Sequence, residues 1–461
     1  MTITEQLPVL FLTGAVPINT VGLNASQELD AEPIFLPVTK YSVTVKRAED
    51  LVNEVDKAVR IAFAGVPGPV HVAMPIDLQL KEVEDQGPCR SFPSPYRDIP
   101  NLENIKYVAA ELVKHKSGCI FVGQGARQSV SELLELAEIL NWPIIRSPQA
   151  KGLISDFHPL SKGIYGFAGH ENASKLINEG QGQALLIIGS SLGETATNNY
   201  NEKLTDGRFV VQIDRDESVF GRKYRADLPI LGDIKESLKM RNNELYRLGS
   251  KRILCPVERV SNEISSAEYN TQNVLRALQR YLPDSIRYSI DIGEFMSYVI
   301  HYMTVFQPCT FDLNVHFGAM GTAIGTAIGM ALANSSEPIV CITGDGCFFM
   351  HGMEILTAKE YNLPILFIVM NNSRLGMVYH GHALQYKRVH SRFEQKPVNI
   401  AEIARAMDLP SLRIEKMEDI QEQSLKALLT GQGPALLEIS LIDNNVPPMG
   451  DRVKFLSSFS K

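Results

Sequence analysis

Apolar segments of strand length alternate with segments of helical periodicity along most of the chain. Near the start, residues 7–14, 32–40 and 68–75 are predicted to be strands, and residues 48–65 form a helical pattern between the last two. Strands that are joined through helices are typical of α/β domains whose sheets are mostly parallel.

The alternation stops at two polar segments and resumes after each of them. Residues 84–101 are rich in proline and polar side chains, and residues 239–263 are strongly charged. We therefore predict an α/β fold of three consecutive domains, which cover residues 1–83, 102–240 and 264–445. The middle domain is predicted to contain strands at 118–123, 142–147, 184–191 and 208–216 and a helix at 132–140, and the last domain to begin with a helix at 270–282.

The amino-acid composition and net charge of the chain limit the kinds of partner that it is expected to bind. Of the 461 residues, 44% are hydrophobic and 21% are charged, so the chain can bury sizeable cores. A net charge of −7 provides no basic surface for nucleic acid. No apolar run reaches the roughly 18 residues of a membrane helix, and the first residues lack the basic region of a signal peptide. The six cysteines are scattered, which is typical of reduced thiols. We expect a cytoplasmic protein that binds neither nucleic acid nor membrane.

An acidic residue stands between two glycines where an apolar run ends. Gly344, Asp345 and Gly346 are followed by a helical pattern, a second apolar run and then Asn372. In a strand–helix–strand unit both polar positions lie at carboxyl ends of parallel strands, where open α/β sheets bind ligands. Carboxylate and amide oxygens suit Mg²⁺, and a glycine beside a helix N-terminus lets phosphate approach. Either motif alone is more often an ordinary turn or strand cap.

Together, in this order and at this spacing, the two motifs resemble the thiamine diphosphate-binding motif. Residues 65–79 and 314–333 resemble segments of the acetolactate synthase large subunit. The resemblance implies thiamine diphosphate and Mg²⁺ as cofactors. It implies that Asp345, Asn372 and the backbone carbonyl of Arg374 bind the metal ion, with Gly344 and Gly346 beside the diphosphate.

The same resemblance assigns further cofactor contacts. Gly293 matches a diphosphate-contacting loop, Gly318 offers its carbonyl to the cofactor's amino group, and Met320 becomes the catalytic wedge beneath the bent cofactor. Glu294 stands where acetolactate synthases tend to have glutamine. Because a carboxylate would repel a diphosphate, we expect Glu294 to point elsewhere. The glycines at 321, 325 and 329 form a stripe that is expected to let a helix pack closely.

Three polar side chains are weaker candidates. Gln27 and Lys40 match active-site positions of the first domain, with exposed polar side chains as the alternative. His380, beside Tyr379 and His382, stands where acetolactate synthases carry a tryptophan. A histidine there can orient a carboxylate or transfer a proton. The alternative is an exposed histidine with no role.

The middle domain contains Gly-Gln-Gly-Ala-Arg-Gln at 123–128, which lacks the third glycine of a dinucleotide fingerprint. A nicotinamide oxidoreductase is therefore a weak alternative. Some relatives hold FAD in this domain, and the sequence leaves FAD undecided.

A second departure from the family, besides the absent tryptophan near His380, limits the resemblance. The family's first domain continues on its N-terminal side and carries a glutamate that activates the cofactor, and no residue here can be matched to it. We expect an incomplete first domain. The predicted function is thiamine diphosphate- and Mg²⁺-dependent decarboxylation and/or carboligation of a 2-oxo acid. The alternative is a non-catalytic or partner-dependent cofactor-binding subunit. The expected partners are further copies of the chain and a separate chain that supplies the missing segment.

Overall fold

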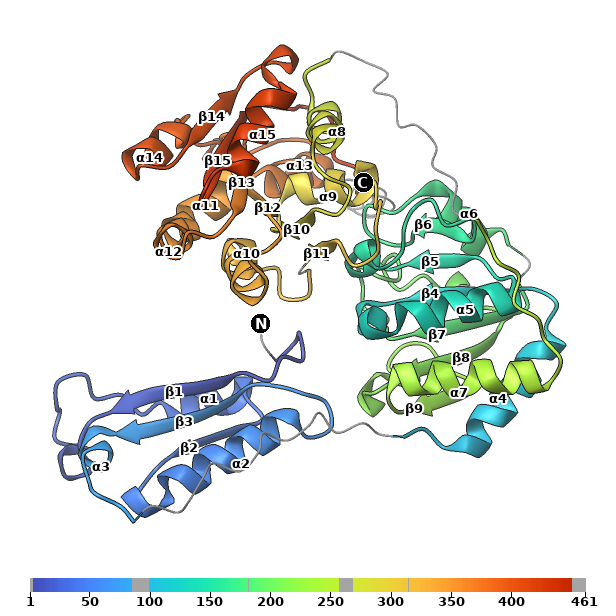
Figure 1. The fold of residues 1–461 in the computed structure, drawn as a ribbon, viewed down its shortest axis with the longest axis horizontal. Helices are drawn as coiled ribbons and strands as arrows, with labels where there is room; N and C mark the ends of the chain where they lie inside the picture. Colours follow the sequence, from blue (N-terminus) through green and yellow to red (C-terminus); the bar gives the residue numbers. More distant parts are fainter. Residues whose placement is uncertain (1–2, 85–98, 181, 257–267, 314, 450–461) are drawn as a thin grey trace. The chain divides into compact units, whose positions relative to one another are not determined.

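The computed structural model describes residues 3–84, 99–180, 182–256, 268–313 and 315–449. The chain forms two compact units, Met1–Ile99 and Pro100–Lys461 (Figure 1). Residues 85–98 of the predicted linker and residues 257–263 of the predicted charged segment lie outside the described residues. Within the described ranges, no helix has the length and apolar character needed to span a membrane.

The first unit contains a parallel three-stranded sheet in the order β1-β3-β2. Its helix α2 buries Ala58 and Ala62 in the same hydrophobic cluster as Val70 and Val72 of β3. The strands are β1 Leu10–Ala15, β2 Tyr41–Thr44 and β3 Val70–Pro75, and the helices are α1 Glu32–Phe35, α2 Leu51–Phe63 and α3 Ile76–Gln79.

The prediction of a strand at residues 32–40 is wrong. Glu32–Phe35 forms the helix α1, and Leu36–Val38 continues it as a 3₁₀ turn. Each segment has a proline in its first turn, where the missing N–H breaks no helical hydrogen bond. Because proline cannot donate to a sheet, the strand begins only after it, at Tyr41.

The second unit contains two parallel sheets of six strands. The first has the order β6-β5-β4-β7-β8-β9 and confirms the four strands predicted between residues 118 and 216. Its elements are α4 Leu102–Lys114, β4 Gly118–Val122, α5 Val130–Leu140, β5 Ile144–Arg146, β6 Ser161–Ile164, α6 Glu171–Asn178, β7 Ala184–Ile188, β8 Phe209–Asp214, β9 Leu228–Leu231 and α7 Ile234–Arg247. The charged segment predicted from residue 239 therefore begins inside α7.

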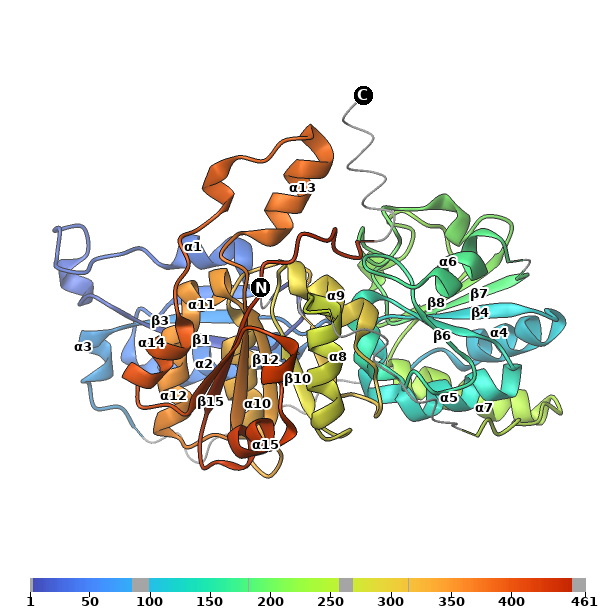
Figure 2. The ribbon, with the colours of Figure 1, turned by 90° about the horizontal axis from the view of Figure 1, so that it is seen from above.

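The other sheet has the order β11-β10-β12-β13-β15-β14. Alternate residues of β13 enter different hydrophobic clusters, with Ile368 on the side of α8 and α9 and Phe367 on the side of α10 and α12 (Figure 2). Its elements are α8 Thr271–Tyr281, β10 Arg287–Ile290, α9 Glu294–Tyr302, β11 Phe311–Leu313, α10 Thr322–Ala333, β12 Ile339–Gly344, α11 Asp345–His351, α12 Ile355–Glu360, β13 Ile365–Asn371, α13 Gly376–Tyr386, α14 Ile400–Ala406, β14 Ser411–Ile414, α15 Glu422–Thr430 and β15 Ala435–Ser440. The predicted α/β fold with mostly parallel sheets is confirmed.

A buried lysine joins the middle segment to α9. Lys151 is fully buried, and its Nζ donates to the carbonyl oxygens of Ile300 (3.0 Å) and Met303 (2.5 Å) at the C-terminal end of α9. Burial lowers the pKa of Lys151 to about 8. The opposite end of the same helix carries Glu294, so α9 runs from this lysine to the region of the glycine and acidic motifs.

Candidate active site

A cleft of about 210 Å³ lies at the carboxyl edge of the second six-stranded sheet. Because β10, β12 and β13 are parallel neighbours, the segments that follow them meet at this edge. All eight residues predicted to contact the cofactor or metal line the cleft: Gly293, Gly318, Met320, Gly344, Asp345, Gly346, Asn372 and Arg374. The structure therefore brings together segments that lie up to about eighty residues apart.

Asp345 carries a buried carboxylate oxygen without a partner. The residue is the first of α11, directly after β12, and is 4% exposed. Its Oδ1 accepts the backbone N–H of Gly346 at 2.8 Å, whereas Oδ2 is buried and accepts no hydrogen bond. Burial raises the pKa of Asp345 to about 6. A buried oxygen that lacks a donor is costly, so this atom fits a metal cation as its missing partner.

Asn372 and Arg374 lie on a tight turn after β13. Ser373 between them has a φ of 52°, in the left-handed region. The side-chain oxygen of Asn372 accepts the backbone N–H of Arg374 at 3.2 Å, which closes the turn. In the part of the chain that the structure describes, no cluster of three histidine, cysteine or acidic residues could hold a metal. One carboxylate, one amide and backbone carbonyls are a different donor set, and hard oxygen donors suit Mg²⁺.

Met320 and two glycines shape the cleft wall. A Cβ on Gly346 would lie 2.9 Å from the Cε of Met320, so the methionine methyl covers this glycine. Gly318 has a φ of +68°, a conformation that favours glycine, and a Cβ there would lie 3.0 Å from Ile292. The structure thus places Met320 in the wall as expected, while its role as a wedge stays a prediction.

Asp291 organises the cleft, although no role was predicted for it. Its Oδ1 accepts the backbone N–H groups of Ile292 and Gly321, both at 3.0 Å, and its Oδ2 accepts the hydroxyl of Thr343 at 2.8 Å. These contacts tie the end of β10 to β12 and to the start of α10. Burial raises the pKa of Asp291. Asp291 could have been found by the same pattern that indicated Asp345, because both are acidic residues at the end of an apolar strand.

Glu294 lines the cleft, so the expectation that it points elsewhere is wrong. It is 5% exposed, and its Oε1 lies 3.6 Å from Nη2 of Arg374 and 3.5 Å from Nε2 of His380. The guanidinium of Arg374 compensates the negative charge of Glu294, so the repulsion from a diphosphate that we expected to turn this side chain away is weakened. A Cβ on Gly376 would lie 1.7 Å from Oε2 of Glu294, so only glycine leaves room for this arrangement.

His380 lies behind the cleft wall. It is 4% exposed on α13, outside the lining of the cleft, and its Nε2 lies 3.2 Å from Nη2 of Arg374. The alternative of an exposed histidine is therefore wrong for His380. The neighbouring Tyr379 packs its ring on the same guanidinium at 4.5 Å, and the ring N–H of His382 donates to the carbonyl of Arg388 at 2.7 Å. A catalytic role for His380 stays a prediction.

Gln27 and Lys40 belong to the first unit. Gln27 is exposed and has a φ of 66°. Lys40 donates from Nζ to the carbonyl oxygens of Ala64 (2.5 Å) and Val66 (2.8 Å), just after α2 ends. Through these contacts Lys40 caps the backbone carbonyls that follow the C-terminal end of α2. The structure does not test the active-site prediction for either residue.

The glycine stripe packs closely at only one of its three positions. A Cβ on Gly321 would lie 2.3 Å from the ring of His351, whereas Gly325 and Gly329 are exposed and have no neighbour within 4 Å of an added Cβ. The expectation of close packing inside the chain is therefore wrong for the latter two.

In comparisons with known proteins, two segments of this chain match models of protein families. Residues 105–240 match the central domain of thiamine pyrophosphate enzymes, and residues 291–439 match their C-terminal TPP-binding domain. A "probable acetolactate synthase large subunit" of Methanocaldococcus jannaschii is 28% identical, over 96% of this chain and 78% of that protein. The acetolactate synthase isozyme 1 large subunit of Escherichia coli K12 is 25% identical, over 96% of this chain and 80% of its own. Benzoylformate decarboxylase from Polynucleobacter necessarius shares the fold, with a TM-score of 0.82 at 19% identity over 96% of this chain and 83% of that one.

Proposed function

Because this chain belongs to the thiamine pyrophosphate enzyme family and is similar to acetolactate synthase large subunits, we propose that it uses Mg²⁺ and thiamine diphosphate to decarboxylate a 2-oxo acid, with or without ligation of the product to a second carbonyl compound. The observation that carries the proposal is the unpaired, buried Oδ2 of Asp345 in the cleft. A divalent cation satisfies that oxygen, and its remaining positions are available to phosphate oxygens.

Three groups would hold the metal ion. Asp345 supplies the negative charge, Asn372 supplies its amide oxygen, and Arg374 supplies its backbone carbonyl. Gly293 and Gly346 line the cleft, and glycine is favoured at both positions because a Cβ on either would lie within 3.0 Å of a neighbouring side chain.

Thiamine diphosphate, when bound, would supply a nucleophilic carbon and a cationic ring that acts as an electron sink for decarboxylation. The chain's own contribution is position and exclusion of water. Met320 lies beside Gly346 in the cleft wall, where it would support the ring system of the cofactor. The ion pair of Glu294 and Arg374 adds little net charge to the cleft wall, so an anionic diphosphate would meet no isolated carboxylate there.

Binding and turnover are tested separately. Calorimetry with thiamine diphosphate, in Mg²⁺ and in EDTA, should show metal-dependent binding to the wild type and none to Asp345→Ala. Unchanged affinity in that variant would refute the metal site. CO₂ release from pyruvate and other 2-oxo acids then measures catalysis. Tight binding without CO₂ release would favour the alternative function, a non-catalytic or partner-dependent subunit.

We also propose a homo-oligomer. Phe349, Met350 and Met353 follow the metal motif on one short helical stretch, and each side chain is at least 47% exposed. Large apolar side chains that gather on a surface are typical of protein–protein contacts. Light scattering of the purified chain tests this, and addition of a separately expressed N-terminal segment tests the need for a second chain. The structure does not test FAD binding, which the sequence left undecided, and the cytoplasmic location stays a prediction.

A further inference from the structure

A buried glutamate lies behind the turn that carries the proposed metal ligands. Glu438 is on β15, the strand between β13 and β14, and its side chain is fully buried. It lies outside the lining of the cleft. Burying a carboxylate is costly unless donors surround it, so its partners indicate which parts of the structure it holds in place.

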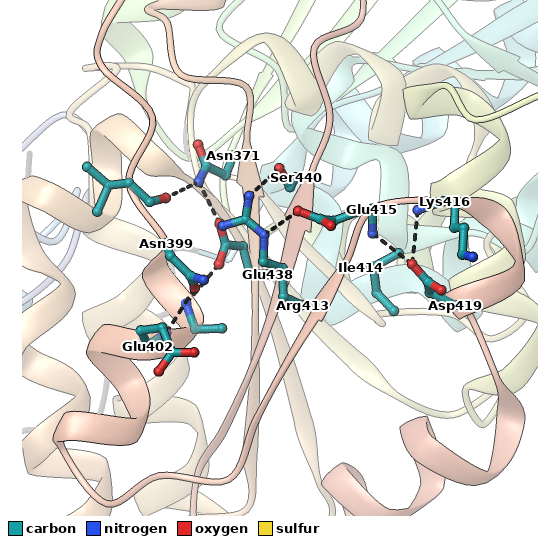
Figure 3. A network of polar contacts seen from close by, with 12 residues as sticks. Asn371, Asn399, Glu402, Arg413, Ile414, Glu415, Lys416, Asp419, Glu438 and Ser440 are labelled. Carbon is teal, nitrogen blue, oxygen red and sulfur yellow. Dashed lines mark hydrogen bonds and ion pairs between the residues drawn. The ribbon is translucent and has the colours of Figure 1, made fainter.

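Those partners come from three different elements (Figure 3). Oε1 of Glu438 accepts Nδ2 of Asn371 at 2.6 Å and Nη1 of Arg413 at 3.1 Å. Oε2 accepts the backbone N–H of Ala401, in α14, at 2.8 Å. Arg413 is held in turn by the hydroxyl of Ser440 at 2.9 Å. The carboxylate therefore joins β14, α14 and the end of β13.

Asn371 connects this carboxylate to the turn. A carboxylate only accepts hydrogen bonds, so Asn371 must direct its NH₂ group towards Glu438. Its oxygen then faces the other way and accepts the backbone N–H of Ser373 at 3.3 Å. Ser373 has a left-handed φ of 52°, which a residue with a side chain adopts only at some cost in free energy. That turn presents Asn372 and the carbonyl of Arg374 to the cleft.

We propose that Glu438 is a positioning residue for the metal site, which acts through Asn371 on the turn that bears two metal ligands. The inference rests on the proposed function, because it concerns the affinity of that site for Mg²⁺. Glutamine at this position keeps the size of the side chain but can offer Asn371 either an oxygen or an NH₂ group. The amide of Asn371 is then held only by the backbone carbonyl of Val398, which accepts from the same Nδ2 at 2.8 Å, and the turn loses the charged part of its support.

The expected effect of Glu438→Gln is a loss of Mg²⁺ affinity of about 10–100-fold, the range found for partners that orient metal ligands. Mg²⁺ is titrated calorimetrically into the full-length chain with thiamine diphosphate in excess. Glu138→Gln is the matched control, because Glu138 is likewise buried, with 5% of its surface exposed, and is bound to an arginine, Nε of Arg252 at 2.5 Å, but lies on α5. The control should keep its Mg²⁺ affinity within about twofold of the wild type, even where both variants lose thermal stability.

Asn371→Ala gives an independent test that leaves Glu438 paired with Arg413. It should lower Mg²⁺ affinity as Glu438→Gln does, and the double variant should lose no more than the single variants, because both changes break one connection. If Glu438→Gln does not fold, Asn371→Ala alone decides. Wild-type Mg²⁺ affinity in the folded variant, or fully additive losses, would overturn the inference. If Asp345→Ala also binds Mg²⁺ and cofactor normally, the proposed function itself fails.

Discussion

Asp345, the proposed anionic metal ligand, is expected to lower the free energy of unfolding of the protein when no metal ion is bound. Its pKa is raised by burial from 3.8 to about 6, so the folded protein holds its charged form at a disadvantage above pH 6. Two pKa units correspond to about 3 kcal/mol. In Asp345→Asn the charge is absent, while the new amide still lacks one partner, at a cost of about 1 kcal/mol. The variant should therefore be more stable than the wild type by about 1–2 kcal/mol at pH 7.5.

The sign of the pH dependence follows from the raised pKa. Between pH 3.8 and 6 the folded state binds more protons at Asp345 than the unfolded state, so the wild type loses stability as the pH rises through this range. The advantage of Asp345→Asn should accordingly shrink as the pH falls from about 6 towards 4.

Thermal unfolding in EDTA without cofactor measures this difference, with an expected gain on the order of 1–2 °C at pH 7.5 for a chain of this length. With Mg²⁺ and thiamine diphosphate at 100 times the dissociation constant, the wild type should gain about 2.7 kcal/mol and the order of stability should reverse. A ligand-free variant that unfolds at a lower temperature than the wild type at pH 7.5 would refute the reasoning, because the buried charge would then already be compensated.

Three other substitutions test separate parts of the structure. Met320→Ala should bind thiamine diphosphate with nearly wild-type affinity but exchange the cofactor's C2 proton more slowly, which NMR measures in deuterated buffer; unchanged exchange would make Met320 ordinary packing. Asn372→Ala should weaken Mg²⁺-dependent binding less than Asp345→Ala does in calorimetry, because it removes a neutral ligand; a larger loss would contradict the assignment. In the wild type, the unfolding free energy should rise between about pH 8 and 10.5, because Lys151 has a lowered pKa in the folded state and the unfolded chain binds one more proton in this range. Lys151→Met should abolish this rise. Denaturant titrations at several pH values measure it, and identical pH profiles for the two proteins would contradict the assignment to Lys151.

Sequence patterns predicted what depends on local periodicity and on strand polarity. Asp345 and Asn372 could be expected to converge because both follow buried strands, and parallel strands end at one edge. The segment at 32–40 was misjudged because its apolar residues outweighed two prolines that begin helical turns. Pairings between distant residues could not be predicted in this way. Glu294 meets Arg374 only after α9 and the turn after β13 have packed together, and nothing near Glu438 in the sequence indicates that Asn371 binds it.

The contact between Gly376 and Glu294 links the evolutionary histories of two positions. A single added methyl group at residue 376 would occupy the place of the glutamate's Oε2, so alanine there would displace the carboxylate of Glu294 from its present position. Among homologues, a residue larger than glycine at 376 should accompany a shorter or differently directed side chain at 294. If residue 376 changed first, the carboxylate of Glu294 would have to leave its present place beside Arg374, so the two positions are expected to vary together.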